Sequence, residues 1–245
     1  MAAALLGLTN SPFFVIEAFF YALLGGLLPA LIWMWFWMHE SYSHNEPKNI
    51  IALTFLGGMA CVFLVYPFQQ LIPRYIFHLD DSSGGTLVIW AALEELFKFA
   101  AAYICAFKIK EAFDEPSDAF IYLMTAALGF TAMENTFYLL APLLQGDTIG
   151  SIVTGNSRFM GASLLHVVAS GALSIFISYA FYKSKWTKRA YILVGLLAAT
   201  VLHTLFNYFI IITTEDSSYL IFSFVWLTTI ILIAALEKVK AIKKF

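Results

Sequence analysis

GTLVIWAALEELFKFAAAYICAF, residues 85–107, is an apolar run of spanning length that carries Glu94, Glu95 and Lys98 near its middle. A helix that crosses the hydrocarbon core of a bilayer needs about 20 mostly apolar residues, and this run supplies them. A charged side chain at the centre of such a helix costs on the order of 2.5–3.5 kcal/mol. We therefore expect a membrane helix that turns its charged side chains toward protein or water, where they serve a function.

The rest of the chain has the same apolar character. Apolar residues make up 61% of the sequence and charged residues 12%, whereas soluble domains are nearer 45–50% and 25%. Including the first run, seven stretches have spanning length: 12–38, 50–72, 85–107, 118–143, 157–182, 190–212 and 219–236. We predict an all-α fold, a polytopic membrane helix bundle of about seven transmembrane helices, with residues 1–245 forming a single domain.

The basic residues between these stretches predict the orientation in the membrane. Loops that contain many lysines and arginines stay on the cytoplasmic side. One side would carry Lys48, Lys108, Lys110, Lys183, Lys185, Lys188, Arg189, Lys238, Lys240, Lys243 and Lys244, and the other only Arg74 and Arg158. We expect an integral protein of the cytoplasmic (plasma) membrane, with the N-terminus outside and the C-terminus in the cytoplasm. The net charge of −2 indicates no nucleic-acid partner, so membrane lipid is the expected surrounding.

Ionisable side chains also occur inside three other predicted spans. Glu134 lies in the fourth, His166 in the fifth and His203 in the sixth. Together with Glu94, each is nine or ten residues from the outer end of its span, roughly 13–15 Å at 1.5 Å per residue. Groups at one depth on neighbouring helices can meet, so we expect them to line one hydrated pocket.

This combination of side chains suits hydrolysis. Like charges push the pKa values of adjacent carboxylates such as Glu94 and Glu95 apart, and Lys98 can stabilise the ionised form. A water held between a glutamate and a histidine can be deprotonated for attack on an amide. His166 and His203 with a glutamate such as Glu134 could instead bind zinc with one open position. A metal-free glutamate mechanism is equally open, and the sequence has no serine-centred or cysteine-centred nucleophile motif.

Ordered motifs give the chain a family resemblance. They are Glu94-Glu95-x-x-Lys98, Gly129-Phe130-x-x-x-Glu134-Asn135, His203-x-x-x-Asn207, Arg158 with His166 in the fifth span, and the early loop Glu46-Pro47-Lys48. With these motifs, residues 46–207 resemble the PrsW family of intramembrane proteases, related to the CAAX-processing and bacteriocin-processing (CPBP) proteases. The resemblance implies cleavage of single-span or membrane-anchored proteins, and family members take part in regulated proteolysis of anti-sigma factors.

The resemblance also implies roles for individual residues. Glu94 and Glu95 would be the catalytic carboxylates and His203 the essential histidine. His166 and Glu134 would complete the site. Lys98, Asn207 and Arg158 would be supporting residues, with Lys98 and Asn207 orienting the catalytic groups.

Two other functions use similar residues. Acidic groups and histidines at membrane depth also occur in proton- or cation-coupled transporters, but these often show repeated halves, which this sequence does not show. A non-catalytic scaffold that retains a protease fold would need no glutamate pair. The ordered motifs therefore favour an intramembrane endopeptidase.

Overall fold

The computed structural model describes residues 12–40, 46–81, 83–212 and 218–242, and within them it is a bundle of helices without strands. In chain order, the elements are α2 (Pro12–Glu40), α3 (Lys48–Leu71), the π-helix η2 (Ile72–Ile76), α4 (Gly84–Ala102), the π-helix η3 (Tyr103–Phe107), α5 (Asp118–Leu144), α6 (Thr148–Ser157), the π-helix η4 (Arg158–Ala162), α7 (Ser163–Tyr179), α8 (Lys185–Ile212) and α9 (Ser218–Lys240). The predicted all-α class is confirmed.

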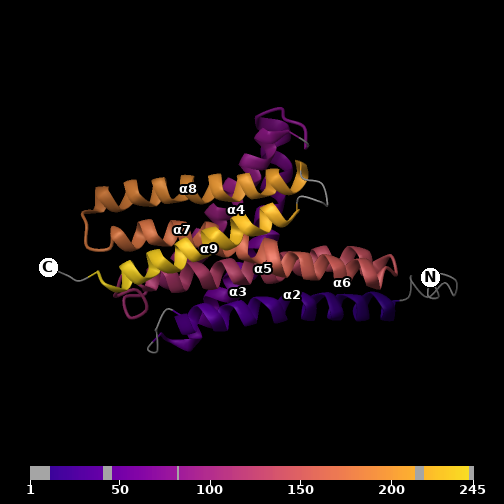
Figure 1. The fold of residues 1–245 in the computed structure, drawn as a ribbon, viewed down its shortest axis with the longest axis horizontal. Coiled ribbons are helices and arrows are strands. Elements are labelled where there is room, and N and C mark those ends of the chain that lie inside the picture. The colour runs from indigo at the N-terminus through magenta and orange to yellow at the C-terminus, as the bar shows by residue number, and fades with distance from the viewer. Residues whose placement is uncertain (1–11, 41–45, 82, 213–217, 243–245) are drawn as a thin grey trace.

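Helix α5 lies at the centre of this bundle. It packs against α2, α3, α4, α6 and α7, and most of its side chains are buried. In Figure 1, α2 and α5 run along the long axis of the molecule, whereas α3 and α4 cross it and their connecting segment projects from the bundle. Helices α7 and α8 pack against each other, and α8 also contacts α4. The helices that carry the ionisable groups are therefore neighbours.

Two glycines explain how closely α3 approaches α5. A Cβ atom on Gly129 would lie 2.0 Å from the carbonyl oxygen of Phe55, and one on Gly58 would lie 2.1 Å from that of Ala126. Neither position can hold a larger residue unless a backbone moves. Small residues that let helix backbones touch are a common device in membrane proteins, and this contact fixes α5 against α3.

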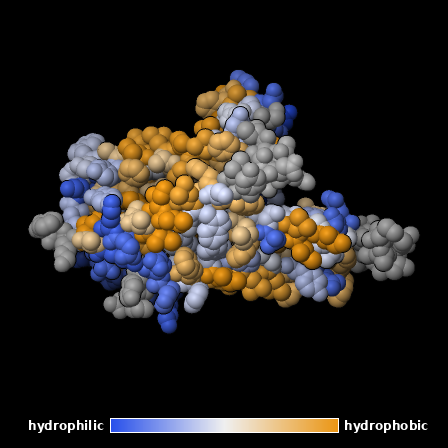
Figure 2. Space-filling model, viewed as in Figure 1, coloured by the Kyte–Doolittle hydropathy of each residue, from blue (hydrophilic) through white to orange (hydrophobic). Residues whose placement is uncertain are grey.

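Five helical segments are long and apolar enough to cross a membrane: Pro12–Glu40, Lys48–Ile76, Thr148–Tyr179, Lys185–Ile211 and Phe222–Lys240. The sequence predicted seven spans, the other two being α4 and α5. Helix α4 carries three charged residues at its middle, and α5 is largely enclosed by other helices. Figure 2 shows apolar side chains across the middle of the molecule and hydrophilic ones gathered at its left-hand end, as expected of an integral membrane protein.

The predicted fifth span begins earlier than expected. We predicted 157–182, but the helical segment starts at Thr148 and continues through α6, η4 and α7. The Asp147 side chain caps this start by accepting a hydrogen bond from the backbone N–H of Gly150. A π-helical turn begins at Arg158, and such turns are frequent at functional sites.

Candidate active site

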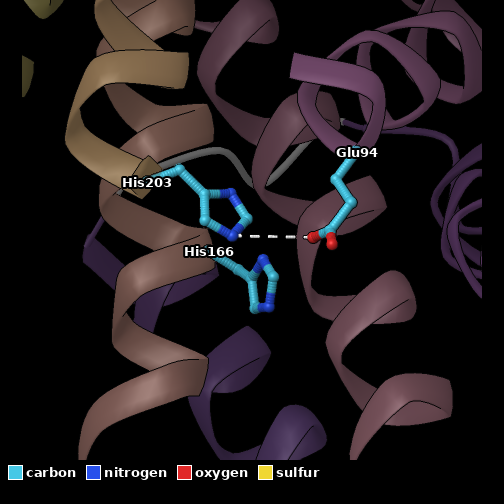
Figure 3. Close-up of side chains that lie close together, drawn as sticks. All are labelled: Glu94, His166 and His203. Carbon is cyan, nitrogen blue, oxygen red and sulfur yellow. Dashed lines mark ion pairs between the residues drawn. The ribbon is translucent and has the colours of Figure 1, made fainter. Parts of the chain in front are cut away.

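The ionisable groups of the central helices meet inside the bundle. Glu94 and Glu95 come from α4, His166 from α7 and His203 from α8, and they are 7%, 0%, 2% and 2% exposed. Figure 3 shows Glu94, His166 and His203 pointing toward one another. The two imidazole rings are 5.0 Å apart between centroids, nearly perpendicular. The predicted meeting of acidic and imidazole side chains therefore occurs in the structure.

Glu95 is the most fully hydrogen-bonded member of the cluster. Its Oε1 atom accepts a hydrogen bond from Lys98 Nζ at 2.5 Å and lies 2.8 Å from Nδ1 of His203. Its Oε2 atom accepts a hydrogen bond from the Ser170 hydroxyl at 3.0 Å. Three donors around a buried carboxylate stabilise its ionised form. His203 then donates through Nδ1, which leaves the lone pair of its Nε2 atom available.

The Nε2 atom of His203 faces Glu94. It lies 3.6 Å from Oε2 of Glu94, and this oxygen is buried without a hydrogen-bond partner among the described residues. The other oxygen of Glu94 accepts a hydrogen bond from Nε2 of Gln69, at 2.9 Å, so Gln69 fixes the carboxylate. A buried carboxylate oxygen without a partner is costly. The site thus presents two open acceptor atoms to whatever binds between them.

His166 connects Lys98, the partner of Glu95, to Glu134. Its Nδ1 atom lies 2.8 Å from Lys98 Nζ, and its Nε2 atom lies 3.0 Å from Oε2 of Glu134. An ammonium group can only donate a hydrogen bond, so Nδ1 accepts and Nε2–H donates to Glu134. Lys98 therefore contacts both Glu95 and His166 and ties α4 to α7.

Glu134 is held from the other side by Arg158. The guanidinium of Arg158 forms an ion pair with Glu134 through Nη2 and donates through Nε to the side-chain oxygen of Asn135. It also lies over the ring of Tyr138, 3.8 Å from its centroid. One arginine thus fixes two consecutive polar residues of α5. Arg158 is the first residue of the π-helical turn η4.

The side chains present also fit a metal ion. Glu94, His166 and His203 each offer a ligand atom, and these three atoms lie within 4.8 Å of one another. One carboxylate and two imidazoles form a donor set that catalytic zinc sites use, and the unpartnered oxygen of Glu94 belongs to it. Both ring nitrogens of His166 already have contacts, so His166 would have to exchange one to bind an ion. This set contains Glu94, whereas the prediction named Glu134, which is paired with Arg158 in the structure.

Most of the predicted site residues come together, with one exception and two additions. Within the part of the chain that the structure describes, Asn207 shares no hydrogen bond with Glu94, Glu95 or His203. Ser170 recurs with His166, Ser174 and Ser178 at every fourth residue of its helix, and this polar spacing is the signal in the sequence for its contact with Glu95. Gln69 gave only a weak signal, as a polar residue near the outer end of an apolar span.

Comparison with known proteins gives the family. The profile described as "PrsW family intramembrane metalloprotease" matches residues 46–236. This chain belongs to the PrsW family. The PrsW proteases of Geobacillus kaustophilus and Halalkalibacterium halodurans are 26% and 23% identical to it, over 86% and 90% of this chain and 87% and 96% of their own lengths. The PrsW protease of Clostridioides difficile is 24% identical over 86% of this chain and 88% of its own length. No solved structure matches the chain.

The family membership agrees with the geometry. The matched region contains every ionisable residue of the cluster, from α4 to α8. The chain is therefore an intramembrane protease, and the predicted resemblance to the PrsW family is confirmed. The description of the family as metalloproteases agrees with the Glu94, His166 and His203 set.

Proposed function

We propose that this protease cleaves single-span or membrane-anchored proteins with Glu94, Glu95, His166, His203 and Glu134 as its catalytic groups. The observation that carries the proposal is the cluster in which these side chains, drawn from four helices, meet; all of them are buried except the partly exposed Glu134. Ionisable groups inside a membrane protein are expensive and generally functional. Among the described residues, the hydrogen bonds of the cluster leave Oε2 of Glu94 without a partner, 3.6 Å from Nε2 of His203.

Within this proposal, Glu94 and His203 act on the attacking water. The unpartnered Oε2 of Glu94 is placed to take a proton, and Gln69 holds the rest of that carboxylate. Glu95 orients His203 through Nδ1 and keeps Nε2 directed at the reaction. This is the arrangement in which a carboxylate fixes the tautomer of a functional histidine.

Glu134 and His166 complete the site from the opposite side. The Nε2–H group of His166 donates to Glu134, while Lys98 fixes the ring through Nδ1. Arg158 places its positive charge beside the Glu134 carboxylate. In this role Lys98 and Arg158 are positioning residues, since each acts on the reaction through a neighbouring group.

As the metal-dependent alternative to this arrangement, we propose zinc at the set formed by Glu94, His166 and His203. Glu94 and His203 would then be ligands of the ion and would no longer act directly on the water. When bound, such an ion polarises a carbonyl and activates water for attack. Its presence is testable without activity, by measuring the metal content of purified protein. Wild-type protein should hold about one equivalent of zinc, since three protein ligands form a catalytic site. His203→Ala should lose it, while Asn207→Ala should keep it. If wild-type protein contains no metal and still cleaves, the zinc proposal is wrong and the metal-free glutamate mechanism is supported.

The proposal includes the arrangement in the membrane. We propose seven spans in a single domain, with α4 and the largely enclosed α5 as two further spans beside the five apolar segments. The N-terminus would lie outside the plasma membrane and the C-terminus in the cytoplasm. The distribution of lysines and arginines between the loops supports this orientation. The kinship with the CAAX-processing and bacteriocin-processing proteases is also part of the proposal. A solved structure of this chain that superposed on that group would support it.

Reconstituted protein tests the activity. The wild type should cleave tagged members of a panel of single-span proteins in liposomes, and Glu95→Gln and His203→Ala should abolish cleavage. Asn207→Ala serves as the matched control, because Asn207 lies on the same helix as His203 but shares no hydrogen bond with the clustered carboxylates in the described structure. Ion flux in the same liposomes without any proteolysis would favour a transporter. Cleavage that persists in both Glu95→Gln and His203→Ala would contradict the proposed catalytic site. A regulated signalling role would show as cleavage that depends on an external stimulus in cells.

A further inference from the structure

A groove leads from the surface of the bundle to the candidate carboxylates. It has a volume of about 560 Å³ and lies between α3, α4 and α5. Glu94 and Glu134 both line it, and Gln69 stands beside Glu94 and donates to it. Most of the remaining lining is apolar and aromatic. The groove is therefore a route by which a mostly apolar molecule could reach the site.

The mouth of the groove faces the lipid. Phe63, Tyr66 and Phe137 line it and are 56%, 62% and 40% exposed. They lie on α3 and α5, and α3 is an apolar helix of spanning length. Side chains at such positions face the hydrocarbon core of the bilayer. A segment already in the membrane could enter from the side without passing through water.

An aromatic pair bridges the two helices at this mouth. The rings of Phe63 and Phe137 lie 5.5 Å apart between centroids in an edge-to-face arrangement. Such a pair is worth roughly 0.5–1.5 kcal/mol beyond the area it buries, so a modest gain in binding energy can separate it. The pair thus bridges the mouth of the groove and can separate when a segment enters.

The inner wall offers a polar group where a substrate needs one. A helix in the bilayer satisfies its own backbone hydrogen bonds, so a peptide bond exposed to attack must first be unwound. The freed N–H and C=O groups then need partners. The Gln69 side chain can supply them beside Glu94, and the Trp90 indole fixes the backbone of Gln69 with a hydrogen bond of 2.8 Å.

We infer that this groove binds the transmembrane segment of a protein substrate, which enters sideways from the bilayer past Phe63 and Phe137 and unwinds beside Gln69. The inference rests on the proposed function, since it concerns access to the same site. A larger groove of about 810 Å³ lies between α2, α5 and α6, but its lining includes none of the clustered glutamates or histidines. Tyr21, 56% exposed, lines that second groove.

Site-specific photocrosslinking tests the inference. In a Glu95→Gln background, which should bind without cleaving, p-benzoylphenylalanine would replace Tyr66, Phe68 or Tyr21 in separate proteins. Phe68 is the matched control: it lies on α3, is 47% exposed, contacts Phe97 and does not line the groove. With the panel of single-span proteins in liposomes, we expect a crosslinked substrate from position 66 and loss of this product at positions 68 and 21.

A substitution that fills the groove provides the second measurement. In otherwise wild-type protein, Val62→Trp narrows the groove from α3 and should abolish cleavage, whereas Phe68→Trp should keep it. In the crosslinking background, Val62→Trp should also remove the product at position 66. If wild-type protein still cleaves, three results would contradict substrate binding in this groove. They are crosslinking of lipid alone at position 66, equal substrate crosslinking at position 68, and substrate crosslinking at position 21 instead of 66. If the wild type cleaves nothing in the panel, the proposed function itself has failed.

Discussion

At the scale of single residues, the hydroxyl of Ser170 supports Glu95 from α7. Ser170→Ala removes the hydrogen bond to Oε2, and a bond to a charged group is worth about 1.5–3 kcal/mol. If it positions Glu95 for the reaction, cleavage should slow by roughly 10- to 100-fold. Ser174→Ala is the control, because Ser174 donates to the carbonyl of Gly171 on its own helix. Equal rates for the two variants would show that the Ser170 contact has no part in catalysis.

The buried ion pair of Lys98 with Glu95 should contribute to the stability of the fold. Lys98 is fully buried, and breaking a buried pair by removing one partner costs about 3–5 kcal/mol. Lys98→Met should therefore reduce the free energy of unfolding, measured by denaturant titration in detergent. The double variant Lys98→Met with Glu95→Gln should recover much of this loss, because no unpaired carboxylate remains. Strictly additive effects would contradict a coupled pair.

These residues also show what a sequence can and cannot predict about a site. Charges in apolar runs, at one depth in each run, predicted that Glu94, His166 and His203 would meet. Depth could not choose between Glu94 and Glu134 as the companion of the histidines, because both lie at that level. The choice depends on the rotation of α5 about its axis and on the reach of Arg158. Gln69 reaches Glu94 from another helix, and periodicity within one helix says nothing of such contacts.

At the scale of helices, the contact of α3 with α5 positions Glu134. Gly129→Ala would bring a methyl group to within 2.0 Å of the Phe55 carbonyl oxygen, so one backbone must move. Overpacking of this kind typically costs about 1–3 kcal/mol, and movement of α5 also displaces Glu134. We expect a lower thermal stability and a large loss of cleavage.

Gly84→Ala is the matched control for this contact. A Cβ atom on Gly84, at the start of α4, would meet nothing within 4 Å, so stability and cleavage should both stay near wild type. Wild-type stability and cleavage in Gly129→Ala would show that α3 and α5 can move apart without consequence, which would contradict the prediction.

At the scale of the whole molecule, the lengths of the apolar runs predicted where the helices occur, but they did not predict whether lipid or protein surrounds each helix. Hydropathy measures whether a segment tolerates lipid, but it does not tell lipid from the apolar interior of a bundle. Helix α5 is enclosed by other helices on most sides. It can therefore carry polar residues such as Glu134 and Asn135, because they contact protein and not lipid. The start of the fifth helical segment was missed for a related reason: α6 contains glycine, serine, threonine and asparagine, and only its continuation into α7 is strongly apolar.

The proposed orientation of the helices in the membrane can be tested by labelling cysteines placed in the loops. If the basic loops are cytoplasmic, the exposed loop that contains Asp81 lies outside and the loop that contains Ser184 lies inside. In a Cys61→Ala, Cys105→Ala background, Asp81→Cys should react with a membrane-impermeant thiol reagent on intact cells. Ser184→Cys should react only after the membrane is opened. A cysteine in place of Tyr66, at the mouth of the groove, would face lipid and should react slowly from either side. The reverse labelling pattern would show that the topology is inverted, with the loop that contains Asp81 in the cytoplasm. Equal labelling of both loops on intact cells would contradict an odd number of spans between them.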